Sequence, residues 1–366
     1  MQWLVKLTLL CVISSFLLLF SRSAPTASLY HIIFTLGIIP LILGAIIYFT
    51  PVLTRTQTAP PQIFLFPVLA LVAGILVVSR LYGVITIPFM IPALLLNVVI
   101  IGLSYWMVQR QKKCLGTPHP CFYWYLAALG CLFVAVTVMG LTHWFPEHWQ
   151  IFKRFHLHLN ILGFIGLTAF STLQVLLPTT AQYSDKETGK RLQQDLKFAV
   201  IAVILLSIGI MLESAVLGII GGIVYMAVVA RFLWRLYDKP CWKNQPSQLL
   251  SLTLVHFFIL LLFGLLHSLY PAVPDNTILL FFTLFLIPLI ISASSWLLPL
   301  WWYAPQERDK QLATRTSLVA WHKGLLIACY LSAVLLLISS KATFIMIILV
   351  GVAYLSRIIQ SRWFLN

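Results

Sequence analysis

Residues 34–45, with the sequence FTLGIIPLILGA, return 248 positions later as FTLFLIPLIISA at 282–293. Each copy lies in a run of more than twenty residues that contains no Asp, Glu, Lys or Arg. A helix that crosses a bilayer needs about 20 apolar residues. Each copy therefore predicts a transmembrane helix, and the likeness of the two points to an internal repeat.

The composition of the whole chain agrees with this. Of the 366 residues, 61% are apolar and only 9% are charged, against about 25% charged in an ordinary soluble domain. This excludes a soluble enzyme, a disordered protein and a secreted disulfide scaffold. The six cysteines form no C-x-x-C pair, so neither a disulfide framework nor a zinc site is expected. We predict an all-α polytopic membrane protein, with residues 1–366 as a single transmembrane domain.

Apolar stretches of bilayer length predict twelve transmembrane spans. In order, they are residues 3–20, 30–50, 62–79, 82–108, 122–142, 155–178, 195–213, 215–236, 249–270, 277–300, 318–340 and 342–360. The first span could be mistaken for a signal peptide, because the small residues of 23–28 follow it. We expect it to be retained, because the repeat needs a helix at this position.

Basic residues are distributed unevenly between the predicted loops. With the N-terminus inside, 19 of the 24 Lys and Arg residues fall on the cytoplasmic side. The five on the outer side are Arg22, Arg80, Lys153, Arg154 and Lys341. Cytoplasmic loops carry an excess of Lys and Arg, so both termini are predicted to be cytoplasmic, in a bacterial-type inner membrane. We interpret the net charge of +15 as a topology signal and not as a nucleic-acid-binding surface.

Proline and glycine positions extend the repeat to three units. Pro51, Pro178 and Pro299 end the second, sixth and tenth spans, and Gly-x-x-Tyr begins at residues 102, 222 and 351 in the fourth, eighth and twelfth. Chance similarity among Leu-rich and Ile-rich segments is the alternative. We favour three repeats of four helices, at about 1–114, 115–241 and 242–366, which would build a bundle with pseudo-threefold symmetry. The charged stretch 181–197 is expected to be a solvated cytoplasmic loop.

Histidines are the main polar residues left inside the spans. His31, His156, His158 and His267 are predicted at a similar depth near the outer face. Ionisable groups in a membrane usually face a cavity or a partner, and neutral imidazole is a common ligand for heme iron and copper. Residues 156 and 158 are about 200° apart around a helix axis, so they would serve sites on opposite faces. Asn160 could orient a ligand by hydrogen bonding.

The remaining histidines are weaker candidates for a functional role. His256 is predicted deeper in the ninth span and His322 near the inner end of the eleventh. His143 and His148 are expected to anchor the membrane interface, and His119 to be solvated. Two charged residues at the outer side, Arg80 and Glu213, are secondary candidates. Arg80 could bind a carboxylate such as a heme propionate and Glu213 a cation or proton, and interfacial placement is the alternative for both.

The histidine-bearing spans resemble a known family. His158-x4-Gly163-x2-Gly166-x-Thr168, and His31-x5-Gly37-x6-Gly44 ending at Pro51, are similar to the two histidine helices of the NnrS family. This resemblance implies a twelve-span inner-membrane protein associated with heme, copper and resistance to nitric oxide.

A more distant resemblance concerns the catalytic subunit of heme–copper oxidases. Its three arcs of four helices, and a His-x-His pair that serves two hemes, are similar to the helix count and to His156-x-His158 here. The adjacent His-His pair of the oxidase copper site is absent from this sequence. A complete dioxygen-reducing oxidase is therefore not expected.

Three functions stay open from the sequence. The first is a protein that binds heme of type b, and copper as a second metal, in the response to nitric oxide or to metal or respiratory stress. His31, His156, His158 and His267 would hold the heme, and His31, His158 and Asn160 would hold a metal. The second is a transporter of a small metabolite, heme or a metal ion, and the third an assembly factor for a respiratory oxidase. The lipid bilayer is the expected surrounding, nitric oxide the expected small ligand, and the sequence identifies no catalytic residue.

Overall fold

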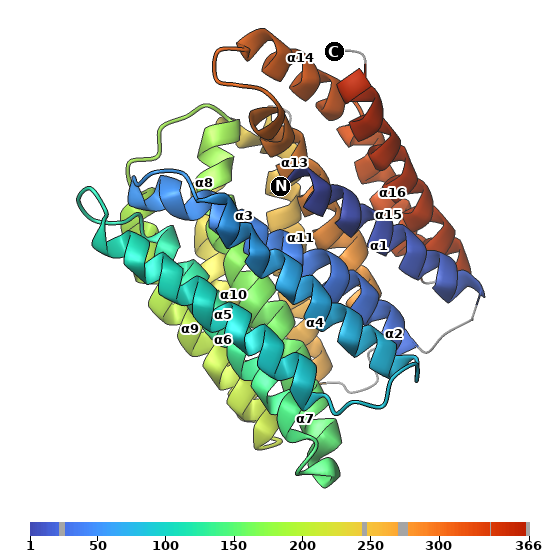
Figure 1. Cartoon of the computed structure of the whole chain (residues 1–366). Coiled ribbons are helices and arrows are strands. Elements are labelled where there is room, and N and C mark those ends of the chain that lie inside the picture. The colour runs from blue at the N-terminus through green and yellow to red at the C-terminus, as the bar shows by residue number, and fades with distance from the viewer. Residues whose placement is uncertain (22–25, 244–246, 270–276, 337, 364–366) are drawn as a thin grey trace.

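The computed structural model describes residues 1–21, 26–243, 247–269, 277–336 and 338–363, and all regular structure in these ranges is helical (Figure 1). Arg22 and residues 23–25 of the signal-like stretch lie outside them. The helices are α1 (Gln2–Ser21), α2 (Thr26–His31), η1 (Ile32–Ile38), α3 (Ile39–Thr54), η2 (Pro61–Phe64), α4 (Leu65–Leu81), α5 (Met90–Lys112), α6 (Cys121–Leu141), η3 (Pro146–His148), α7 (Trp149–His158), η4 (Leu159–Gly166), α8 (Leu167–Thr180), α9 (Thr188–Met211), α10 (Ala215–Leu236), η5 (Pro240–Trp242), α11 (Ser247–Leu269), α12 (Thr277–Leu280), η6 (Phe281–Leu286), α13 (Ile287–Trp302), α14 (Arg308–Val319), α15 (His322–Leu335) and α16 (Ser340–Trp363).

Twelve helical stretches in the described ranges are long and apolar enough to cross a membrane, which confirms the predicted class and number of spans. Four of them begin well away from the predicted residue. The fourth begins at Met90 and not at residue 82, because Gly83, with a φ of 72°, and Pro88 keep the preceding segment in a loop. The sixth, seventh and eleventh begin earlier, at Pro146, Thr188 and Arg308, in segments whose charged residues hide them from a hydropathy reading.

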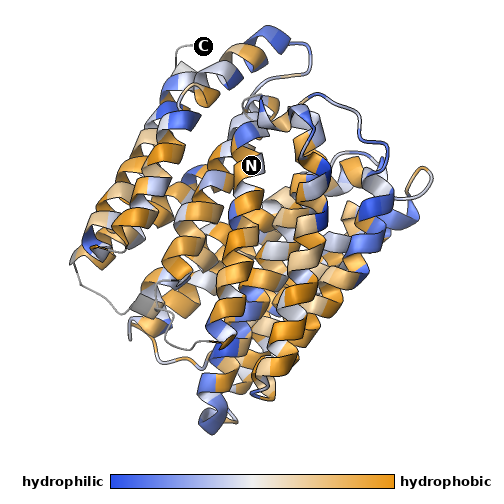
Figure 2. Cartoon of the chain, turned by 180° about the vertical axis from the view of Figure 1, so that it is seen from behind, coloured by the Kyte–Doolittle hydropathy of each residue, from blue (hydrophilic) through white to orange (hydrophobic). Residues whose placement is uncertain are grey.

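The surface has the polarity of a membrane protein. Apolar residues cover most of the length of the bundle, and hydrophilic residues gather at its two ends (Figure 2). The first residues of α1 and the last turns of α16 lie at the same end (Figure 1). We name this the inner end and the opposite one, which carries η3, the outer end.

The twelve spans form a closed ring in sequence order. Each span packs against the next one along the chain, and α16 packs against α1. The first span of each predicted unit also packs on the second span of the preceding unit, in the pairs α1 with α13, α6 with α3 and α11 with α8. This arrangement places spans two, six and ten innermost, where they line a central cavity.

These three inner spans share one local deviation. Each changes from α-helix to π-helix and back, at η1, η4 and η6, and each has a proline two or three residues before its end. π-Helix is rare and is often found at functional sites. Carbonyl groups in all three segments accept hydrogen bonds from side chains of neighbouring spans: Gly37 from Thr8, Leu162 from Tyr225 and Leu284 from His256. The common α–π–α pattern supports the threefold repeat, which stays a prediction.

The tyrosines of the three Gly-x-x-Tyr motifs differ in their burial. Tyr225 and Tyr354 are completely buried and donate hydrogen bonds to carbonyl groups of spans six and ten. Tyr105 in the first unit is 66% exposed. The tyrosine of the first unit therefore has no equivalent packing role.

Candidate functional site

Two of the outer histidines form a ring pair between spans two and six. The imidazole rings of His31, the last residue of α2, and His156, in the last turn of α7, have centres 6.4 Å apart and planes that differ by 10°. Both side chains are partly buried. Just below them, η1 packs against α1 and α4, whereas η4 packs against α6 and α9. The facing sides of spans two and six thus meet at this level through the two imidazoles.

Backbone carbonyls set the protonation of the outer histidine rings. The Nδ1 atom of His31 lies 2.8 Å from the carbonyl oxygen of Ala27, and that of His156 lies 3.0 Å from the carbonyl oxygen of Ala135. Because a carbonyl oxygen can only accept, we assign the ring hydrogen to Nδ1 in both. Nε2 then keeps a lone pair, and in the described part of the chain neither Nε2 makes a hydrogen bond. This is the second-shell arrangement typical of metal-ligating histidines.

The side chain of Asn160 contacts His156 and not His158 in the described part of the chain. Its side-chain nitrogen donates to the carbonyl oxygen of His156 at 2.8 Å and lies 3.3 Å from Nδ1 of the same residue. The first contact caps a carbonyl next to the π-helix η4. Asn160 thus orients the backbone that carries the ligand candidate.

His158 faces a different neighbour. Its Nδ1 donates to the carbonyl oxygen of Arg154 at 2.8 Å, within its own helix. It lies close enough to His267, in the last turn of α11, to interact with it electrostatically. His267 itself is exposed. Of the four outer histidines, only His31 and His156 are in ring contact in the described part of the chain, and His158 lies on a different side of span six, about 200° around the helix axis from His156.

The two imidazoles of His31 and His156 are better suited to binding a heme than a bare metal ion. Among the described residues, no group of three or more His, Cys, Asp or Glu side chains could hold a metal ion. A structural zinc or copper site usually needs three or four protein ligands. Heme brings its own four nitrogens and needs only axial ligands from the protein. His31 and His156 are the two side chains that could supply such ligands to one heme.

The two deeper histidines have hydrogen-bond partners. Nδ1 of His256 bonds the carbonyl oxygen of Leu284 at 2.7 Å, and its Nε2 bonds the hydroxyl of Tyr330 at 2.9 Å. With both nitrogens used, His256 is a packing residue. Nε2 of His322 bonds Ser295 at 2.9 Å, and its buried Nδ1 has no partner in the described ranges.

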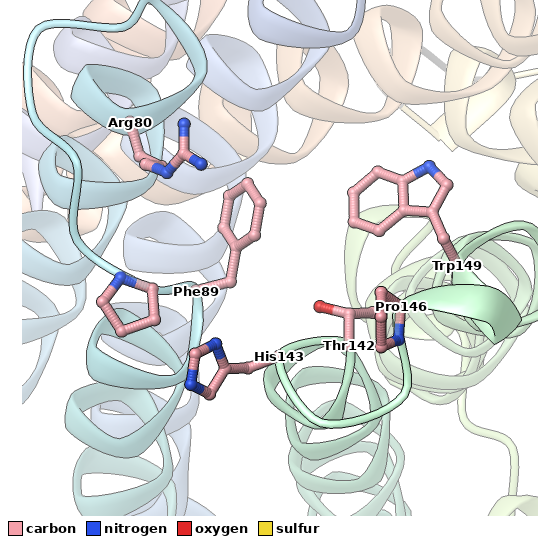
Figure 3. A pocket seen from close by; sticks show the side chains of 7 residues that line it. Arg80, Phe89, Thr142, His143, Pro146 and Trp149 are labelled. Carbon is pink, nitrogen blue, oxygen red and sulfur yellow. The ribbon is translucent and has the colours of Figure 1, made fainter.

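A pocket of about 380 Å³ opens at the outer end beside Arg80 (Figure 3). The Arg80 guanidinium lies 5.5 Å from the centre of the Phe89 ring, and its buried Nε has no partner among the described residues. His143 and Trp149 also line this pocket. Trp149 lies two helical turns before His156 on the same face of α7. The cationic pocket is therefore on the outer side of the histidine pair.

The other outer candidates are at the surface. Glu213 is exposed, with a φ of 51°, in the turn between α9 and α10. His143 and His148 are exposed in the loop around η3. His119, at the inner end, is partly buried, and its Nδ1 accepts a hydrogen bond from the backbone of Cys121. Burial, and then the charge of Arg55, lowers the pKa of His119, which keeps it neutral at pH 7.

The expectation that residues 181–197 form a solvated loop is wrong for its second half. α9 begins at Thr188, and Arg191 and Asp195 are almost fully buried. Arg191 donates to Gln174 at 2.6 Å and to Asp185 at 2.8 Å, and Asp195 pairs with Arg231 of α10. Charge alone predicted exposure, because Gln174 and Arg231 lie on other spans and these partners cannot be read from the local sequence.

Comparison with known proteins adds no family assignment. No family model matches the chain, and no curated protein matches it.

Proposed function

We propose that this chain is a heme-binding membrane protein in which His31 and His156 are the axial ligands. The main support for this proposal is the contact between the His31 and His156 rings, which lie between spans two and six. It brings two imidazoles from different spans together at one level, and its Nδ1 hydrogen bonds leave both Nε2 atoms with lone pairs that could hold a heme iron. Arg80 is the candidate partner for the propionate groups of the same heme.

The proposed role is NnrS-like, in the response to nitric oxide or respiratory stress, in an inner membrane with both termini cytoplasmic. A heme supplies a one-electron redox centre, and it binds a diatomic gas where one axial position becomes free. The residues of this chain would hold the heme at the outer end, orient His156 through Ala135 and Asn160, and shield the site between the apolar faces of spans two and six. The heme is proposed to be of type b. Copper has less support than heme, because no contact in the described part of the chain brings its candidate ligands His31, His158 and Asn160 together.

The absorption spectrum of the purified protein tests the heme assignment. Protein made in heme-replete cells and purified in detergent should show a Soret band, and His31→Ala and His156→Ala should each reduce heme content more than tenfold. His158→Ala is the matched control, since it lies two residues away and has the same kind of Nδ1 bond.

The outcomes separate the ligand pairs. A colourless wild-type preparation would remove the heme proposal. Loss of the band in His158→Ala and His267→Ala, with the band kept in His31→Ala, would move the site to the other face of span six.

A further inference from the structure

The centre of the bundle contains an apolar cavity, partly open to its surroundings, away from the histidine pair. Its volume is about 120 Å³, and the inner-half residues of spans two, six and ten supply nearly all of its wall. It begins at Ile38, seven residues after His31, which is about 10 Å further along the helix. Ile165 and Leu286 stand at the same level in the other two spans. The cavity thus lies between the histidine pair and the inner end.

The hydroxyl groups in the cavity wall already donate their hydrogens to other groups, and only their oxygen lone pairs remain. Thr168 donates to the carbonyl oxygen of Phe164, Thr172 to that of Thr168, and Ser294 to that of Ile290, each on its own helix. The Tyr125 hydroxyl bonds Thr172 at 2.9 Å. Within the described part of the chain, the indole N–H of Trp301 is the only buried donor of the wall without a partner.

The polarity and the volume of the cavity indicate whether water or an apolar molecule would occupy it. A buried water needs two to four polar partners, whereas apolar cavities of about 150 Å³ stay dry and bind xenon or benzene. This wall offers a water molecule one free donor, the Trp301 indole N–H, and otherwise only lone pairs of hydroxyls that already donate elsewhere, so it favours an apolar guest. A cavity of about 120 Å³ is also too small for a lipid chain or a quinone ring with its substituents.

We propose that this central cavity is a binding site for a small uncharged diatomic gas. Apolar walls hold such a molecule by dispersion, and the Trp301 indole N–H offers its weak acceptor end a single hydrogen bond. The choice of nitric oxide as the natural guest rests on the proposed function. The proposal that a gas occupies the cavity does not rest on the proposed function, because no wall residue belongs to the proposed heme site.

Xenon is the probe for this site, because it is apolar and its position can be located by anomalous diffraction. Crystals of the protein under xenon pressure should show one strong anomalous peak inside the cavity. Ala169→Leu and Ala293→Leu place extra side-chain volume in the cavity from spans six and ten, and each should abolish the peak. Filling a cavity does not usually prevent folding. Ala313→Leu on the exposed face of α14 is the matched control and should keep the peak.

The outcomes distinguish this proposal from the heme assignment. A wild-type crystal without xenon in the cavity, a peak that survives both filling variants, or ordered hydrogen-bonded waters in the cavity would each overturn the gas site. A protein that binds xenon there but has no Soret band would keep the gas site and remove the heme.

Discussion

At the residue scale, the role of each polar side chain depends on the hydrogen-bond partners that it finds inside an apolar bundle. His31 and His156 each use Nδ1 on a backbone carbonyl, whereas His256 uses both nitrogens. This difference separates a ligand candidate from a packing residue, although all three are histidines in membrane spans. The buried charges follow the same rule, since Asp195 and Arg191 are buried only where Arg231, Gln174 and Asp185 meet them.

Removing one partner of the Asp195–Arg231 pair should be costly. Asp195 is completely buried, so Arg231→Met leaves an unpaired carboxylate and should destabilise the protein by about 3–5 kcal/mol. The double variant Asp195→Leu with Arg231→Met should recover most of that loss. Thermal unfolding of the detergent-purified variants measures both effects. Equal loss in the single and double variants would show that the pair has no such coupling.

Asp185 should make stability depend on pH in the acid range. Partial burial tends to raise the pKa of its carboxyl, but hydrogen bonds from Arg191 and Thr188 outweigh this and hold the pKa below its ordinary value. A carboxyl with a lowered folded-state pKa adds stability above its unfolded pKa of about 3.9, and this stability is lost as the pH falls through the folded value. Melting temperatures of wild type and Asp185→Asn should differ at pH 7 and converge below about pH 3. A constant difference over this range would contradict the assignment.

At the element scale, the three α–π–α spans are the distinctive feature. A π-helix turn holds more residues than an α-helix turn, so it rotates the side chains before it relative to those after it. His31 and His158 directly precede η1 and η4, and Leu280 directly precedes η6. The glycines inside η4 let neighbouring helices approach it closely.

Gly163 should be intolerant of a side chain. A Cβ atom there would lie 2.7 Å from Cβ of Cys131 on α6, and α6 also supplies the carbonyl that orients His156. Gly163→Ala should destabilise the protein by about 1–3 kcal/mol and lower its heme content. Gly130→Ala on α6 meets nothing within 4 Å and should be neutral or stabilising. Matched thermal unfolding curves and heme-to-protein ratios test this, and equal behaviour of the two variants would refute it.

Sequence reasoning predicted the spans well and the contacts between them poorly. Hydropathy is local, so twelve spans follow from the chain itself, with errors only where Gly83 or charged turns intervene. The sequence placed His31, His156, His158 and His267 at a similar depth, but it did not show that His31 meets His156 in a ring contact. Helix rotation decides which residue faces a neighbour, and packing and the π-helices set that rotation. The central cavity was missed for the same reason, because its wall comes from three spans far apart in the chain.

At the scale of the whole molecule, twelve spans form a closed ring in which spans two, six and ten lie innermost. The outer histidine pair and the central cavity lie along these inner spans, one below the other. Apolar residues occupy most of the length of the bundle (Figure 2), as expected where lipid replaces water as the solvent. The orientation of this bundle in the membrane is a prediction from the distribution of Lys and Arg.

Fusion reporters test that orientation. A fluorescent protein fused after residue 366 should be active in the cytoplasm, and alkaline phosphatase fused after residue 145, in the loop before η3, should be active outside it. The opposite pattern of activities would show that the histidine pair faces the cytoplasm.

The most direct test of the central claim is the ligation state of the iron in the oxidised wild-type protein. Electron paramagnetic resonance and near-infrared magnetic circular dichroism distinguish two imidazole ligands from other axial sets. We predict a low-spin ferric heme with two histidine ligands in the wild type. In His31→Ala and in His156→Ala, the heme should become high-spin or be lost. A five-coordinate high-spin heme in the wild type, or a bis-histidine signal unchanged in both variants, would contradict it.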